Sequence, residues 1–130
     1  MEAAPGQLLW EMDRPPDVSS IERSLYEFSA ATHANGLIHG DVRPWNVVVD
    51  DQNQIRVIDW NLSCFLDDLR LGDRLLRGHF AKFHRSLKIN EILRIDRIDA
   101  ERIVALLRGQ IRFPQAWAQN PSWYPAWCQH

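Results

Sequence analysis

The chain contains little lysine and little cysteine. Lys82 and Lys88 are the only lysines among 130 residues, so arginine supplies the rest of the basic residues. Cys64 and Cys128 are too few for a disulfide framework and do not form a zinc-binding pattern. Reduced thiols and a cytoplasmic location are therefore expected.

Long apolar runs and a strong net charge are also missing. No run approaches the roughly 18 apolar residues that a membrane helix needs. The N-terminus has no basic region followed by an apolar stretch, as a signal peptide would. Fifteen Lys and Arg against 17 Asp and Glu give a net charge of −2. We therefore expect neither a membrane nor a nucleic acid as a partner.

What is present fits one folded domain, mainly α-helical with a small β-hairpin. Hydrophobic residues make up 45% and charged residues 25% of the chain, the range of a globular protein. Apolar residues at helical spacing predict helices over 20–34 and 89–108. Residues 1–18 and the tail from Phe113 are expected to be irregular, and 62–88 to be loop with one or two short helices.

Short signals mark the ends of these helices. Ser19 and Glu22 have the spacing of a capping box, and Asn35-Gly36 favours a helix end. Gly109 is expected to end the second helix. Its charged residues are interpreted as a solvated face with local ion pairs; they are Arg94, Asp96, Arg97 and Asp99.

A predicted hairpin brings oxygen-bearing side chains together. Residues 47–49 and 55–58 are β-branched runs separated by a polar turn, which predicts two antiparallel strands. Asn46 precedes the first strand and Asp59 follows the second, so they should lie at the same end of the hairpin. Asp41 lies in the loop before it. Two carboxylates and an amide oxygen suit a hard divalent ion such as Mg²⁺.

These residues resemble a known family. The segment His39-Gly40-Asp41-Val42-Arg43-Pro44-Trp45-Asn46 is similar to the catalytic loop of protein-kinase-like phosphotransferases, whose pattern is H-x-D-x-x-x-x-N. Ile58-Asp59-Trp60 resembles their metal-binding D-F-G segment. The helix over 20–34 lies where that family has the helix leading into the loop. Residues 1–8 are similar to the hinge between the two lobes.

The resemblance implies a role for each matched position. Asp41 would accept or orient the proton of an attacking hydroxyl, and Arg43 would counter charge on the transferred phosphoryl group. Asn46 and Asp59 would hold Mg²⁺ against the phosphates of ATP, and His39 would brace the loop. The acceptor would be a hydroxyl on a protein or a small molecule. Gly40 stands where protein kinases often have arginine, and His-Gly-Asp is frequent in the branch that resembles aminoglycoside and choline kinases.

The resemblance covers the large lobe and not the smaller N-terminal lobe. The chain has no G-x-G-x-x-G loop and no lysine before Lys82, the features that clamp the nucleotide in that family. We therefore expect a kinase-like lobe over 1–110, beginning near the hinge, and a Pro- and Trp-rich tail over 111–130. The missing lobe could come from elsewhere, including a partner protein. The alternative is a pseudokinase-type scaffold without catalysis.

Overall fold

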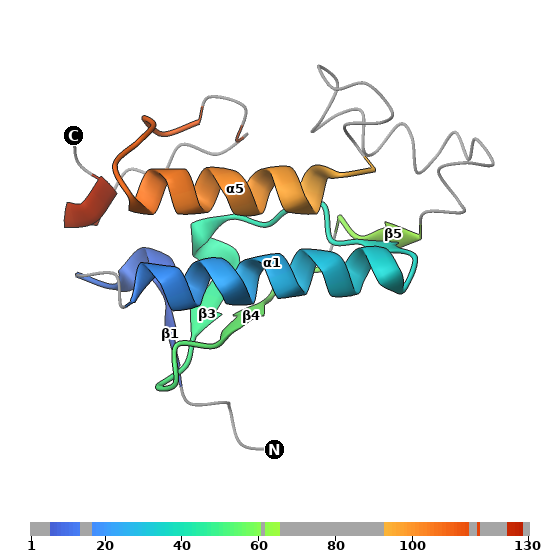
Figure 1. Ribbon diagram of the computed structural model, residues 1–130, viewed down its shortest axis with the longest axis horizontal. Helices are drawn as coiled ribbons and strands as arrows, with labels where there is room; N and C mark the ends of the chain where they lie inside the picture. Colours follow the sequence, from blue (N-terminus) through green and yellow to red (C-terminus); the bar gives the residue numbers. More distant parts are fainter. Residues whose placement is uncertain are drawn as a thin grey trace.

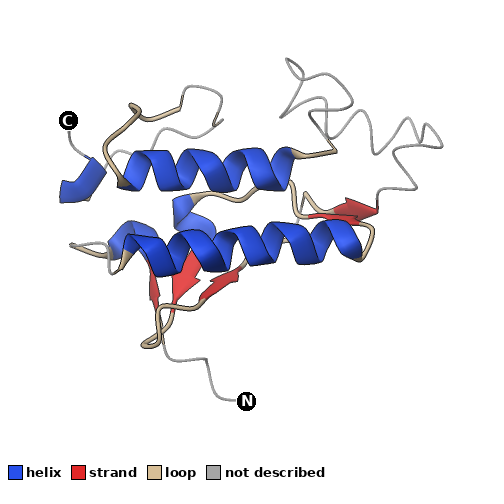
Figure 2. Ribbon diagram, viewed as in Figure 1, coloured by secondary structure: helices blue, strands red, loops and turns tan. Residues whose placement is uncertain are grey.

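The computed structural model describes residues 6–13, 17–60, 62–65, 93–114, 117 and 125–128. Within them, helix α1 (Val18–Ala34) packs alongside helix α5 (Ile95–Leu107), as Figure 1 shows. Short antiparallel strands complete an α+β arrangement (Figure 2). The predicted class is thus confirmed at this level. No helix in these parts of the chain is long and apolar enough to cross a membrane.

Helix α1 begins slightly before its predicted start. Asp17 is the N-cap: its carboxylate accepts hydrogen bonds from the Ser19 amide and the Ser20 hydroxyl, both at 3.0 Å. The cap assigned to Ser19 was therefore wrong, because the helix begins at Val18 and the aspartate before it accepts from the Ser19 amide. The helix ends at Ala34, and Gly36 follows with φ +69°, as the Asn35-Gly36 signal predicts.

The predicted hairpin is present. Strand β3 (Val47–Val49) pairs antiparallel with β4 (Ile55–Val57). Asp50 shapes the turn, since its side chain accepts from the amides of Gln52 and Gln54 at 2.9 Å. The expectation that residues 1–18 are irregular is wrong for strand β1 (Gln7–Leu8), which pairs with the outer side of β3.

A second small sheet supports the segment that follows α1. Strand β2 (Leu37–Ile38) pairs antiparallel with β5 (Cys64–Phe65). A loop was predicted where β5 occurs, because two residues are too short to give a strand pattern. Residues 66–92, with the short helices predicted there, lie outside the described residues.

Helix α5 differs from its prediction in which face it buries. It spans Ile95–Leu107, and Gly109 follows with φ +68°. Asp96 and Asp99 are 6% and 0% exposed, so their assignment to a solvated face was wrong. They lie three residues apart on the side that also buries Ile103. Residues 89–92 of the predicted helix are outside the described residues.

The core joins both ends of the chain to the helices. Trp10, in the 3-10 turn η1 (Leu9–Glu11), packs edge-on against Trp45 and Trp127, with ring centroids 5.5 and 5.9 Å apart. Trp45 lies in η2 (Pro44–Asn46), and Trp127 lies in η3 (Ala126–Cys128). Trp127 of the C-terminal segment is therefore a packing residue. The division at residues 110 and 111 stays a prediction.

Candidate functional site

The loop between β2 and β3 carries four of the five predicted site residues: His39, Asp41, Arg43 and Asn46. Its backbone is fixed by local hydrogen bonds: the Asp41 amide donates to His39 Nδ1 at 3.1 Å, and the Asn46 amide to the Arg43 carbonyl at 2.8 Å. The Ile58 amide donates to the Asn46 carbonyl at 2.8 Å, which ties the loop to the end of the hairpin. The site thus lies between the end of β2 and the end of the hairpin at which β3 begins and β4 finishes.

Asp41 and Asn46 are in direct contact. The Asn46 amide nitrogen Nδ2 donates to the Asp41 carboxylate Oδ2 at 3.1 Å and to its backbone carbonyl at 3.0 Å. Asn46 is 5% exposed, whereas Asp41 is partly open to solvent. Burial raises the pKa of Asp41 above its ordinary 3.8, and the nearby Arg43 charge opposes that rise. A carboxylate held in this way can accept a proton and is presented in one orientation.

Arg43 lies behind Asp41 and is 4% exposed. Its Nε is 3.6 Å from Asp41 Oδ1, and its Nη1 forms a buried ion pair with Asp99 of α5. The ring of Trp117 lies under the guanidinium carbon at 5.2 Å. The positive charge of Arg43 is therefore buried, between the carboxylates of Asp41 and Asp99.

Asp59 lies just after β4, at the hairpin end that the sequence predicted. It is exposed and has φ +60°, in the left-handed region that few residues other than glycine adopt. Its negative charge contributes to raising the pKa values of both Asp41 and His39, so the three groups are near enough to interact electrically. Strained backbone of this kind concentrates at functional sites.

His39 joins the loop to the hairpin. It is fully buried, its Nδ1 accepts from the Asp41 amide, and its Nε2 lies 3.0 Å from the Ile58 carbonyl oxygen. The proton is therefore assigned to Nε2, because a carbonyl can only accept. Burial lowers the pKa of His39 below its ordinary 6.5. The Trp60 ring lies against it, with centroids 4.6 Å apart.

Asp96 is a site-supporting residue that the sequence analysis missed. Its carboxylate accepts from the His39 amide at 2.8 Å, the Gly40 amide at 2.9 Å and the Thr32 hydroxyl at 3.1 Å. It thereby anchors the loop to both helices. The signal that could have revealed it is an aspartate in line with the apolar positions of a helix, since an ionised group is buried only with partners.

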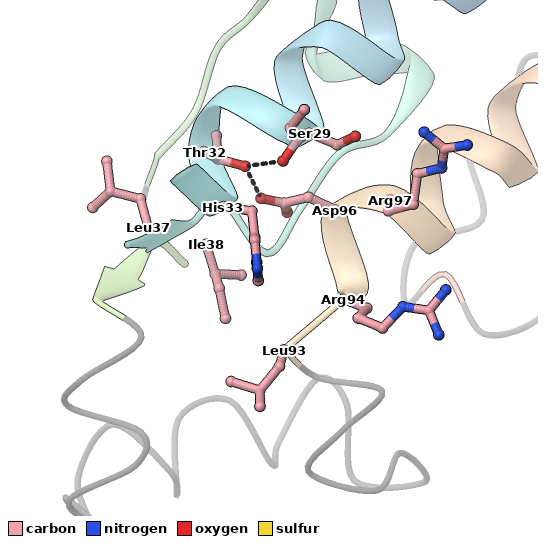
Figure 3. Close-up of a pocket in the computed structure, with 10 residues that line it drawn as sticks. Ser29, Thr32, His33, Leu37, Ile38, Leu93, Arg94, Asp96 and Arg97 are labelled. Atoms are coloured by element: carbon pink, nitrogen blue, oxygen red, sulfur yellow. Dashed lines mark hydrogen bonds between the residues drawn. The ribbon is translucent and has the colours of Figure 1, made fainter. Parts of the chain in front are cut away.

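A cavity of about 400 Å³ lies on the other side of this anchor, between the end of α1 and the start of α5. Figure 3 shows Thr32 hydrogen-bonded to Ser29 and Asp96, with Arg94 and Arg97 at the same end of α5 as Asp96. Asp96 thus separates the cavity from the loop. Because Asp96 is hydrogen-bonded to the loop amides, its role is to hold the loop in place.

Comparison with known proteins assigns the family. The family model described as the phosphotransferase enzyme family matches residues 2–75, which include the whole loop, the hairpin and Asp59. The chain belongs to the phosphotransferase enzyme family. The predicted resemblance to protein-kinase-like phosphotransferases is confirmed.

The chain is similar to parts of two kinases of different kinds. The human phosphorylase b kinase gamma catalytic chain, liver/testis isoform, is 43% identical over 51 residues, which are 39% of this chain and 13% of the relative. The O-antigen chain terminator bifunctional methyltransferase/kinase WbdD of Escherichia coli is 43% identical over 67 residues, 46% of this chain and 9% of the relative. The chain therefore spans only a small part of the length of the relatives it matches.

The phosphotransferase site contains oxygen atoms of the kind that magnesium prefers. Both hydrogen bonds found for the Asn46 side chain use Nδ2, which leaves Oδ1 as the atom able to coordinate a cation. With Asp41 and Asp59 it forms a set of two carboxylates and one amide, and Mg²⁺ takes such hard oxygens while keeping several waters. Within the described ranges, no three His, Cys, Asp or Glu side chains cluster closely enough to hold a metal alone.

Proposed function

We propose that this chain carries the catalytic loop of a phosphotransferase that uses ATP and Mg²⁺ to phosphorylate a hydroxyl group. The carrying observation is the contact between Asp41 and Asn46, in a loop fastened to α5 through Asp96. Phosphoryl transfer needs positioning and charge neutralisation more than covalent chemistry from the protein. A fixed carboxylate beside metal-binding oxygens supplies both.

Each residue of the loop has a defined part in this proposal. The oxygen of the acceptor hydroxyl forms a bond to the γ-phosphorus of ATP, the bond from that phosphorus to the β–γ bridging oxygen breaks, and ADP leaves. Asp41 takes the hydroxyl proton, for which its raised pKa is suited. Asn46 and Asp59 would hold Mg²⁺, which neutralises charge on the phosphates when bound. Arg43 adds a positive charge beside Asp41, and His39 joins the loop to the hairpin.

The fold assignment is part of the same proposal. We take α1, the loop, the hairpin and α5 as elements of the large lobe of a protein-kinase-like fold, over 1–110. The smaller lobe, with its phosphate-binding loop and lysine, would come from another segment or a partner protein. The acceptor would be a hydroxyl-bearing protein or small molecule, and the location cytoplasmic.

A second candidate is a pseudokinase-type scaffold. It is favoured by the absence of a G-x-G-x-x-G loop and of any lysine before Lys82 in these 130 residues. Without them, the nucleotide phosphates would be held from one side only. In that case the same lobe would serve as a binding module.

Nucleotide binding separates the two candidates. Isothermal titration of the chain with Mg²⁺ and ATP should show binding tighter than millimolar, abolished by Asp59→Asn. Asp51→Asn is the matched control, because Asp51 is an exposed aspartate in the turn at the far end of the same hairpin. Absence of binding in all three proteins would favour the scaffold.

Transfer is tested separately. Incubation with radiolabelled ATP, Mg²⁺ and a panel of hydroxyl-bearing proteins and small molecules should give a labelled product. Asp41→Asn should abolish the labelling, because the amide cannot accept the proton, while Asp51→Asn retains it. Labelling that survives Asp41→Asn would remove Asp41 from this role.

A further inference from the structure

The guanidinium of Arg43 is enclosed by residues from two distant parts of the chain. Asp99 of α5 pairs with Nη1, and the Trp117 ring lies under the guanidinium carbon at 5.2 Å. These two residues also contact each other, since the Trp117 indole Nε1 donates to Asp99 Oδ1 at 3.4 Å. Trp117 is 3% exposed and Asp99 is fully buried. Arg43 thus has a fixed support on the side opposite Asp41.

We propose that Asp99 and Trp117 are positioning residues, which hold Arg43 so that its Nε faces the Asp41 carboxylate and fixes the orientation of that carboxylate. The inference deepens the proposed function and rests on it for its catalytic meaning. It gives the C-terminal aromatic segment a part in the site, although Trp117 contacts none of the proposed metal ligands in the interactions found here.

The two carboxylate oxygens of Asp99 have different partners, which supports this inference. Oδ2 faces Arg43, while Oδ1 receives Trp117 and, at 3.5 Å, Arg102. The carboxylate is therefore oriented from one side and presents its other oxygen to Arg43. Because Arg43 Nη1 is engaged there, the guanidinium plane cannot turn away from Asp41 without breaking a buried charge pair.

Packing fixes Trp117 in turn. Its ring lies edge-on to Trp45 and to Phe113, with centroids 5.8 and 5.4 Å away. Trp45 directly precedes Asn46 in the loop. The indole is therefore held in place by the two rings that it contacts directly.

Nuclear magnetic resonance tests the positioning without requiring activity. In a ¹⁵N-labelled chain, the Arg43 Nε–H signal should be visible and slow to exchange with water. Asp41→Asn should shift it, since that carboxylate lies 3.6 Å from Nε. Trp117→Phe keeps a ring but removes the indole donor, and should shift the signal and speed its exchange about tenfold. The matched control is Trp127→Phe, which removes an indole bonded to the Met12 carbonyl. Its ring packs against Trp10, away from Arg43, so the Arg43 signal should be unchanged.

An Arg43 signal that is identical in the wild type and Trp117→Phe, or equally shifted in Trp127→Phe, would overturn the proposal. Asp99→Asn offers a second variant should Trp117→Phe fail to fold, and it should produce the same shift.

Kinetics then separates this inference from the proposed function. In the transfer assay, Trp117→Phe should lower kcat about tenfold to a hundredfold, the size of effect expected from a misplaced catalytic group, while KM for ATP changes less than about twofold. A rise in the KM for ATP as large as the fall in kcat would contradict the positioning of Asp41. If the wild type transfers nothing, the proposed function fails, whereas the resonance result still decides whether Asp99 and Trp117 hold Arg43.

Discussion

Asp96 on α5 accepts the backbone amide of His39 at 2.8 Å, across 57 residues of sequence. The same carboxylate binds the next amide, that of Gly40, through its other oxygen. A helix side chain therefore fixes the direction in which the loop leaves β2. The position of Asp41, one residue later, follows from that contact.

Asp96→Ala should lower the free energy of unfolding by roughly 3 kcal/mol or more, because it leaves two buried amides and the Thr32 hydroxyl without their acceptor. Urea denaturation measures the loss. Glu101→Ala, on the same helix, removes an exposed ion pair with Arg97 and should cost less than about 1 kcal/mol. Equal costs for the two variants would show that Asp96 does not anchor the loop.

His39 should be neutral at pH 6.5, with its proton on Nε2. Burial lowers the pKa of this imidazole, so the unfolded chain binds a proton more readily than the folded one. The His39 contribution to stability is thus present above pH 6.5 and is lost as the pH falls toward the lower folded value. Long-range ¹H–¹⁵N spectra report the tautomer directly. A charged ring at pH 6.5 would contradict the assignment.

Asp99 should make stability depend on pH in the opposite sense. Burial raises its pKa from 3.8 to about 6, and Arg43 opposes this rise. The folded state binds that proton more tightly, so the Asp99 contribution is greatest below pH 4 and is lost as the pH rises through 6. Relative to Asp99→Asn, the wild type should therefore be more stable at pH 4 than at pH 7, by a difference on the order of 3 kcal/mol. Urea titrations of both proteins at the two pH values test this, and an equal difference at both would refute it.

Gly6→Ala should weaken the pairing of β1 with β3. An added Cβ would lie 2.7 Å from Val48 Cγ1 and 2.9 Å from the Val49 carbonyl oxygen, so the strands would have to separate. We expect a loss of about 1–3 kcal/mol in thermal or urea unfolding. Gln7→Ala, an exposed position in the same strand, should change stability much less. Hydrogen exchange at the β1 amides would localise the effect.

Local patterns predicted the elements on which the site is built. The valine run of β3, the polar turn and the isoleucine-containing β4 each carry their own signal, and the hairpin geometry places Asn46 and Asp59 at one end. The ends of α1 and α5 at Gly36 and Gly109 follow from the left-handed conformation that glycine adopts readily.

Contacts between distant segments could not be predicted in this way. Strand β1 has two residues, and only its pairing with β3 makes it a strand. The spacing of apolar residues predicts a helix over 89–108, but it does not reveal that the buried face of α5 includes Asp96 and Asp99. Charged residues on a helix usually indicate an exposed face, but here each aspartate has a partner in the loop more than 50 residues earlier.

The indole of Trp127 donates a hydrogen bond to the Met12 carbonyl, across 115 residues. During synthesis on the ribosome, the contact between Trp10 and Trp127 cannot form until residue 127 has left the exit tunnel. Contacts so distant in sequence slow folding, since the entropy of closing the loop is lost before the packing is gained. A nascent chain thus leaves the face of Trp10 that Trp127 covers open to solvent until residue 127 has emerged.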